Sequence, residues 1–180
     1  MRLLLQDTIA LVIDVQERLI PAMADSQNLL ARTLKLIDGL KLLEVPFLIS
    51  EQFPQGLGPT LPSVTERLPG ILPWPKLSFS CCDEPHLLEA LLASGRKNVV
   101  IFGVEAHVCV QQTVTDLAAL EFQPVVIADA VASRNPADAE RALARMRSEG
   151  AIVTGLESLL FELTREAGTD RFKAISKLVK

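Results

Sequence analysis

The chain has 180 residues, of which 49% are hydrophobic and 22% are charged, and its formal net charge is −4. This composition is typical of one globular domain of roughly 100–200 residues, and it excludes a disordered chain. The sequence has no basic cluster, which disfavours a nucleic-acid partner, and its apolar runs fall short of the roughly 20 residues that a membrane span needs.

The beginning of the chain and its cysteines indicate a compartment. Gln6 and Asp7 interrupt the first apolar stretch, which therefore lacks the pattern of a signal peptide. Three cysteines, two of them adjacent, fit neither a disulfide framework nor a zinc motif. We therefore expect a cytoplasmic protein with reduced thiols. We interpret Cys81 and Cys82 as incidental, one buried and the other near the surface.

Strand-like and helix-like segments alternate along the chain. Short apolar runs predict strands at residues 9–13, 46–50, 76–80, 98–102, 124–128 and 151–153. Apolar residues spaced by three and four predict helices at residues 29–43, 86–94, 106–120, 136–149, 156–165 and 170–180. Residues 51–75 form a long, proline-rich irregular section, and loops of that length are usually functional. The alternation predicts a mostly parallel sheet with helices on both faces.

Cys109 lies where a buried strand is followed by a helix. Gly103 interrupts the strand, and the helical spacing begins at Ala106. Free backbone N–H groups and the positive end of the helix dipole favour a thiolate at this place, so we expect a thiol pKa below the usual value of about 8.5. The alternative is that Cys109 is a small core residue, since free cysteine is often buried.

Polar residues follow several of the predicted strands. Asp14 ends the first strand, Glu51 and Gln52 follow the second, and Lys76 lies near the third. Ligands of parallel sheets bind beyond the carboxyl ends of the strands, so we expect these residues to gather there with Cys109. A carboxylate, a lysine and a cysteine in one place provide a base, a cation and a nucleophile.

Several of these residues also have a structural interpretation. Asp14 could cap the following helix, and Lys76 could be a solvated surface charge. Phe53 and Phe79 fit packing as well as substrate contact. The run Asp14-Val15-Gln16-Glu17-Arg18 stands where a dinucleotide-binding protein has G-x-G-x-x-G, which argues against an oxidoreductase of that kind.

Three motifs together resemble those of the isochorismatase-like cysteine hydrolase superfamily. They are Asp14-Val15-Gln16, Lys76 before Leu77-Ser78-Phe79, and Gly103-Val104-Glu105-Ala106-His107-Val108-Cys109. Residues 51–60 and 142–147 resemble its branch of isochorismatase domain-containing proteins, and the similarity continues through residues 172–178. The resemblance implies a single domain over residues 1–180, with a three-layer α/β/α fold around a six-stranded parallel Rossmann-like sheet.

The resemblance also implies the site residues. It implies a catalytic triad of Asp14, Lys76 and Cys109 and a cis peptide bond between Val104 and Glu105. We expect the backbone N–H groups of Glu105 and Cys109 to form an oxyanion hole. The candidate residues for the substrate pocket are Gln16, Leu19, Gln52 and Phe79.

Two departures from the family narrow the expected function. Nicotinamidases carry a metal-binding Asp-x-His after the second strand, whereas this chain has Glu51-Gln52 there and only His86 and His107 elsewhere. We therefore expect neither a metal nor a cofactor. Isochorismatases that hydrolyse a vinyl ether do without the cysteine, so Cys109 indicates a C–N hydrolase.

These observations lead to one expected function and one alternative. We expect a metal-independent cysteine hydrolase that acts on a small amide or related C–N substrate through a thioester intermediate. We expect it to form a homo-oligomer with neither a nucleic-acid nor a membrane partner. The alternative is a non-catalytic interaction protein that retains the hydrolase fold.

Overall fold

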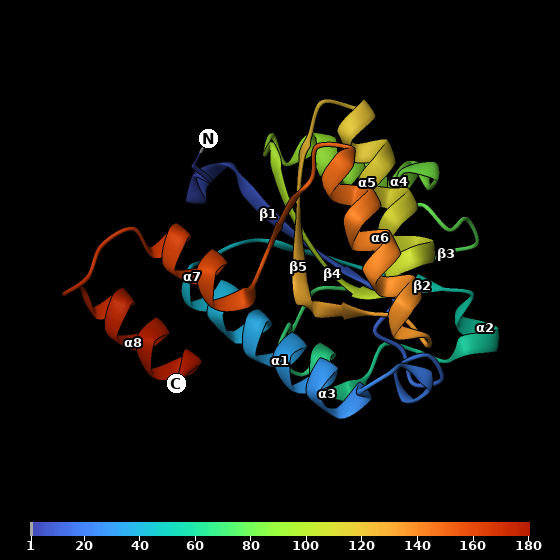
Figure 1. The fold of residues 1–180 in the computed structure, drawn as a ribbon, viewed down its shortest axis with the longest axis horizontal. Coiled ribbons are helices and arrows are strands. Elements are labelled where there is room, and N and C mark those ends of the chain that lie inside the picture. Colours follow the sequence, from blue (N-terminus) through green and yellow to red (C-terminus); the bar gives the residue numbers. More distant parts are fainter. Residues whose placement is uncertain (1) are drawn as a thin grey trace.

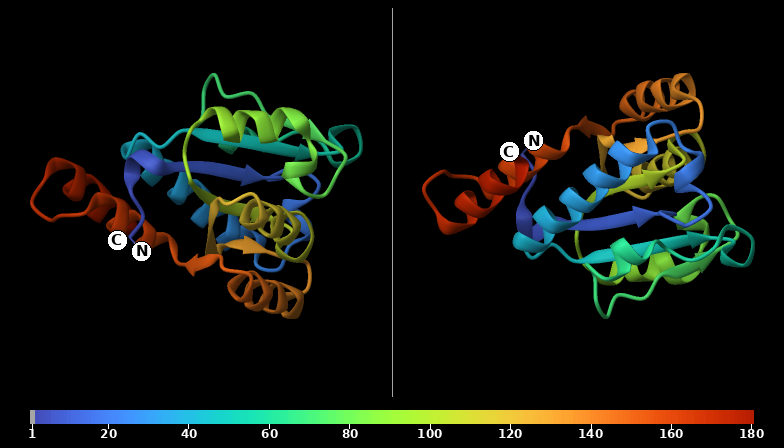
Figure 2. Two further views of the ribbon diagram at one scale, coloured as in Figure 1. Left: turned by 90° about the horizontal axis from the view of Figure 1, so that it is seen from above. Right: turned by 90° about the horizontal axis from the view of Figure 1, so that it is seen from below.

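The computed structural model describes residues 2–180, which fold around one six-stranded sheet with helices on both faces (Figure 1). The strands are β1 (Thr8–Ile13), β2 (Phe47–Gln52), β3 (Trp74–Lys76), β4 (Asn98–Val104), β5 (Gln123–Ala132) and β6 (Ile152–Thr154). Their order is β3-β2-β1-β4-β5-β6, and every neighbouring pair is parallel. Figure 2 shows β1 and β2 running in the same direction. The predicted α/β/α fold is confirmed.

The helices divide between the two faces of the sheet. Helices α1 (Ser26–Leu42) and α7 (Leu156–Thr164) lie on one face, with α8 (Asp170–Val179) packed against them (Figure 1). Helices α4 (Pro85–Ala93), α5 (Gln111–Ala119) and α6 (Pro136–Ser148) lie on the other face. Shorter turns are α2 (Pro54–Leu57), α3 (Pro62–Thr65), the 3₁₀ turns Leu5–Asp7, Ile20–Ala22 and Cys81–Asp83, and the π-helical turn Ala106–Val110.

The central strands β1 and β4 are buried on both faces, which accounts for their continuous apolar sequences. Along β1, Ala10 and Val12 pack into the core beneath α1. Ile9, Leu11 and Ile13 pack into the core beneath α4 and α5. Because side chains alternate along a strand, one sheet separates the interior into two cores.

The chain leaves the centre of the sheet in two directions. It passes from β1 to β2 and β3 on one side, returns to β4 beside β1, and then continues to β5 and β6 on the other. The strand order therefore reverses between β1 and β4, which is where ligands of such sheets bind. Asp14 directly follows β1, and Glu105 directly follows β4, so the fold brings both residues to this point.

The third strand differs from the prediction. It comprises Trp74–Lys76, whereas the alternating pattern predicts residues 76–80. The prediction is wrong because the N–H groups of Leu77 and Ser78 donate to Glu84 Oε1, at 2.9 and 3.1 Å, and do not continue the ladder with β2. The preceding irregular section also contains two short helices, α2 and α3.

Gly103 lies inside β4, which corrects the prediction that it interrupts the strand. Its φ is +120°, and a Cβ atom at this position would lie 2.0 Å from the carbonyl oxygen of Ile13 on β1. Glycine is therefore required here, because the two central strands approach too closely for a side chain. Strand β5 also exceeds its prediction, since it continues past Asp129 to Ala132.

Candidate active site

Asp14 lies at the end of β1 and is fully buried. Its φ is +54°, in the left-handed region that aspartate tolerates better than most residues. The Ser50 hydroxyl donates to Asp14 Oδ1 at 2.7 Å. Lys76 Nζ lies 2.9 Å from Oδ2, but Oδ2 accepts no well-aligned hydrogen bond, so this contact is an ion pair. The side chain therefore does not cap a helix, which was its structural interpretation.

Lys76 is the last residue of β3, and its side chain is completely enclosed. Besides Asp14, its ammonium donates to Gln52 Oε1 at 2.5 Å and to the carbonyl oxygens of Ser78 and Phe79, at 3.3 and 3.1 Å. Burial alone lowers the pKa of Lys76, but the Asp14 carboxylate counteracts this effect, and the pKa lies above its usual value. The ammonium therefore stays charged at neutral pH, and Lys76 is not a solvated surface charge.

Gln52 connects the lysine to the cysteine. Its Oε1 accepts from Lys76 and lies 3.7 Å from Cys109 Sγ, which donates to it. Its Nε2 donates to the carbonyl oxygen of Leu77 at 2.9 Å, so the orientation of the carboxamide is determined. The structure thus brings Asp14, Gln52, Lys76 and Cys109 together from four separate segments of the chain.

Cys109 lies in the π-helical turn between β4 and α5, and it is buried. Burial raises the pKa of its thiol, and Asp14 raises it further, whereas Lys76 lowers it. The net direction is upward, which contradicts the expectation of a lowered thiol pKa. The prediction rested on the helix terminus and underestimated desolvation and the neighbouring carboxylate. The resting residue is a neutral thiol next to a base.

The other two cysteines are also protonated. Burial raises the pKa of Cys81 to about 11 and that of Cys82 to about 12. Cys81 is fully buried behind the lysine, and Cys82 is partly exposed, as the sequence indicated. The backbone N–H of Cys81 donates to Thr113 Oγ1 at 2.9 Å, which ties the segment after β3 to α5.

The connection from β4 to the π-helical turn has an unusual backbone. The Val104–Glu105 peptide bond is cis, at the position that the resemblance implies. The Glu105 carbonyl accepts from the N–H groups of Val108 and Val110, at 3.1 and 3.2 Å, and the Glu105 carboxylate pairs with Arg134 at 3.1 Å. These contacts hold the segment that carries Cys109 against the loop after β5.

The remaining pocket candidates have different surroundings. Gln16 is fully buried, and its carboxamide donates to the carbonyl oxygens of Gln52 and Gly58 and accepts from the Gln52 N–H. It therefore joins the loop after β1 to the end of β2. Leu19 is partly buried and packs against the core beneath α1. Phe79 and Phe53 are about half exposed, at 52% and 48%. Of the pocket candidates Gln16, Leu19, Gln52 and Phe79, Gln52 is the one that accepts a hydrogen bond from the Cys109 thiol.

Ser50 is a site residue that the sequence analysis missed. It lies opposite Ile13 in the β1–β2 ladder, and Ile13 is the residue before Asp14. The sequence offered a signal for this contact. The first two predicted strands end at residues 13 and 50, and if two neighbouring parallel strands end level with each other, Ser50 lies beside the turn that begins at Asp14. Ser50 is also the first polar residue after the apolar run Phe47-Leu48-Ile49 of β2.

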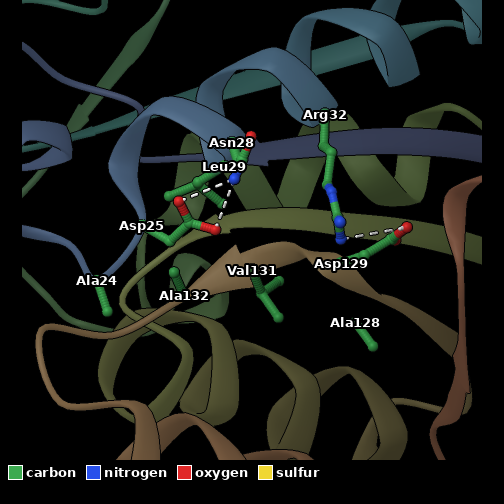
Figure 3. A pocket seen from close by; sticks show the side chains of 9 residues that line it. All are labelled: Ala24, Asp25, Asn28, Leu29, Arg32, Ala128, Asp129, Val131 and Ala132. Atoms are coloured by element: carbon green, nitrogen blue, oxygen red, sulfur yellow. Dashed lines mark hydrogen bonds and ion pairs between the residues drawn. The ribbon is translucent and has the colours of Figure 1, made fainter.

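One cavity lies away from the buried cluster, and another reaches its lysine. The first, of about 150 Å³, is lined by α1 and β5 residues, including Asp25, Asn28, Arg32 and Asp129 (Figure 3). It contains no residue of the buried cluster. The dashed lines in Figure 3 mark the Arg32–Asp129 ion pair and the Asn28 amide that donates to Asp25. A second cavity, of about 310 Å³, reaches Lys76, Leu77 and Glu84 from outside. Neither cavity is lined by Cys109.

Two structural features are absent from residues 2–180. No group of three or more histidine, cysteine, aspartate or glutamate side chains is arranged to hold a metal ion in that part of the chain. In the same residues, no helix combines the length and the apolar character that crossing a bilayer requires.

Comparisons with known proteins point to one family. Residues 8–158 match the family described as "Isochorismatase domain". The chain is 39% identical to isochorismatase domain-containing protein 1 of Danio rerio over 169 aligned residues. The alignment covers 93% of this chain. It spans only 59% of the length of that relative.

Solved structures agree with this match. The structure described as MAR1 ribonuclease from Caenorhabditis elegans has a TM-score of 0.92 and 33% identity, covering 99% of this chain and 92% of that one. YcaC from Pseudomonas aeruginosa, solved with hexane-2,5-diol and covalent acrylamide, has a TM-score of 0.92 and 27% identity, covering 98% and 91%. With its parallel sheet, its buried Asp14–Lys76 pair and its Cys109 beside Gln52, the chain belongs to the isochorismatase family of hydrolases.

Proposed function

We propose that the protein is a metal-independent cysteine hydrolase that cleaves a small amide or a related C–N substrate. One observation carries this proposal. A neutral thiol, a carboxylate and a charged ammonium share one buried place, where Lys76 Nζ lies 2.9 Å from Asp14 Oδ2 and the Cys109 thiol faces Gln52. Such a set supplies a nucleophile, a proton acceptor and a fixed positive charge.

The first half of the reaction transfers the acyl group to sulfur. As Cys109 Sγ attacks the substrate carbonyl carbon, the S–H bond breaks, its proton passes to Asp14 Oδ2, and the sulfur electron pair forms the S–C bond. The carbonyl electrons move to oxygen, where the N–H groups of Glu105 and Cys109 stabilise the negative charge. Each such donor contributes about 2.7–4 kcal/mol in other enzymes. The C–N bond then breaks, and the leaving nitrogen takes the proton from Asp14.

The second half releases the product. Asp14 takes a proton from a water molecule, whose oxygen attacks the thioester carbon. The C–S bond breaks, and the sulfur recovers the proton from Asp14. Lys76 remains charged throughout and stabilises the carboxylate and the transient thiolate in turn. The raised pKa of Cys109 fits this cycle, because proton transfer then accompanies attack and does not precede it.

Mass spectrometry tests the proposal directly. The purified chain is incubated with a panel of small amides, ureido compounds and nicotinamide analogues, and intact mass is followed over time. We expect at least one slow substrate to leave an acyl group that peptide mapping places on Cys109. Cys109→Ser is the matched control, since it keeps the shape of the site. A panel without turnover or adduct would favour the interaction-protein alternative.

The name of the Caenorhabditis elegans relative introduces RNA as a second substrate class. This chain has a net charge of −4 and no basic cluster, whereas RNA binding relies on positive surfaces. We therefore expect RNA in the same panel to remain intact. Cleavage that is lost in Cys109→Ser would replace the amide proposal, and cleavage that persists would indicate a contaminant.

We also propose that the chain is a single domain that self-associates. One sheet carries both cores, which supports a single domain over residues 1–180. Apolar side chains are exposed around the edge strand β3, and they include Leu72, Trp74, Leu77 and Phe79. An edge strand with such neighbours is a common place for association. Light scattering at micromolar concentration should give more than the mass of one chain, and a monomer mass would contradict this.

A further inference from the structure

We propose that Ser50 is a positioning residue for the general base, and that its hydroxyl determines which oxygen of Asp14 receives the Cys109 proton. This inference rests on the hydrolase function proposed above. Ser50 is fully buried on β2 and belongs to none of the three motifs that carry the family resemblance.

Ser50 holds Asp14 at two points. The Asp14 backbone N–H donates to the Ser50 carbonyl oxygen at 3.2 Å, and the Ser50 hydroxyl donates to Asp14 Oδ1 at 2.7 Å. Asp14 has a left-handed backbone, and its side chain must be held in one orientation to keep both oxygens in place. One residue thus restrains the backbone and the carboxylate of the base together.

The two carboxylate oxygens have different tasks. Oδ1 is occupied, because the Ser50 hydroxyl donates to it. Oδ2 is buried and accepts no well-aligned hydrogen bond, although Lys76 Nζ lies 2.9 Å away. Because the Ser50 hydroxyl occupies Oδ1, Oδ2 is the oxygen whose lone pairs no hydrogen bond uses. The geometry therefore directs the Cys109 proton to Oδ2.

The groups that face Asp14 come from three segments besides β2. They are Lys76 at the end of β3, Cys109 in the π-helical turn, and Cys81 in the 3₁₀ turn that follows β3. Lys76 already donates to three oxygens besides its ion pair with Asp14, so it cannot reorient to replace a lost contact of Asp14. Without the Ser50 hydroxyl, the carboxylate would keep its ion pair but lose the restraint on its rotation.

The test compares two variants of the same shape. Ser50→Thr keeps a hydroxyl, whereas Ser50→Val replaces it with a methyl group. The readout is the rate at which the best slow amide substrate acylates Cys109 at neutral pH, followed by intact mass and peptide mapping. We expect Ser50→Val to react about 10- to 100-fold more slowly than Ser50→Thr, the scale of a misplaced catalytic group. In an Asp14→Asn background the two should react alike, because the hydroxyl acts through the carboxylate.

Two measurements separate positioning from general damage. Thermal unfolding identifies any variant that fails to fold, and Ser50→Ala, the smallest change, then takes the place of Ser50→Val. Ser80→Ala is the matched control. Ser80 is about as buried as Ser50, but its hydroxyl accepts a hydrogen bond from the Cys82 N–H and donates none to Asp14. Equal rates for the hydroxyl and methyl variants, with a reactive wild-type Cys109, would overturn this inference alone. A wild-type Cys109 that does not react would overturn the proposed function and this inference with it.

Discussion

Two aspartate–cation pairs lie toward the carboxyl ends of the strands, and they differ in almost every physical respect. Asp14 and Lys76 are 2.9 Å apart, and both side chains are 0% exposed. Asp129 and Arg32 are 3.9 Å apart, with side chains 34% and 54% exposed, in the cavity of Figure 3. The first pair lies in a low-dielectric interior and the second in contact with water, where an ion pair contributes little.

The difference indicates that burial, and not the pairing of charges, distinguishes the proposed site. Asp129 has a structural task, because its Oδ1 accepts the N–H of Leu156 at 2.9 Å at the start of α7. Asp14 has no such task and faces a thiol whose pKa it raises. Water would screen that interaction at the surface. The predictions below test this contrast, from the largest expected effect to the smallest.

Removing the nucleophile should have the largest effect. Cys109→Ala should abolish acyl-adduct formation and lower hydrolysis at least about 10⁴-fold, the scale seen when other enzymes lose their nucleophile. Cys82→Ala removes a more accessible thiol that lies outside the buried cluster and should leave hydrolysis unchanged. Steady-state kinetics with the best substrate measures both variants. Substantial activity in Cys109→Ala would exclude the covalent mechanism.

Neutralising each aspartate in turn compares the two pairs directly. Asp14→Asn should lower kcat by about 10²–10⁴-fold, because it removes the proton acceptor. Asp129→Asn should leave kcat unchanged, since its amide oxygen can still accept from Leu156. If both substitutions lowered kcat alike, the distinction between a buried and an exposed pair would fail.

Removing each cation should separate the pairs by stability. Lys76→Met leaves the Asp14 charge buried without a partner, and such changes cost about 3–5 kcal/mol. Arg32→Met breaks a partly exposed pair, for which about 0–1 kcal/mol is usual. Urea unfolding at neutral pH measures both variants. Equal losses would mean that solvent reaches Asp14 in the folded chain.

Alkaline pH should weaken the folded state gradually. Folding raises the pKa of Cys81 to about 11 and that of Cys82 to about 12, and it also raises the pKa values of Cys109 and Lys76. Each group binds its proton more tightly in the folded state. Its contribution to stability is therefore complete below its pKa in the unfolded chain, 9.0 for cysteine and 10.5 for lysine, and is lost as pH rises through its pKa in the folded chain. Urea unfolding should show this decline above about pH 9, and Cys81→Ala should reduce it.

The order of strands and helices was predictable because each element carries its own pattern. Strand β1 is an uninterrupted apolar run, and the spacing along α1 places Leu36, Ile37 and Leu40 on one buried face. Local patterns failed where side chains from elsewhere intervene. Glu84 takes the N–H groups that would extend β3, and Ile13 leaves no room for a side chain at Gly103.

By itself, the sequence determined the fold, the family resemblance and the identity of Asp14, Lys76 and Cys109 as candidates, because strand-end positions and motif residues can be read in one dimension. Only the tertiary structure decided the state of the site. The direction of the Cys109 pKa depends on how completely water is excluded and on how near Asp14 lies, and neither is written in local spacing. The role of Ser50 likewise arises only when β2 pairs with β1, because a hydrogen bond between residues 36 positions apart exists only in the folded chain.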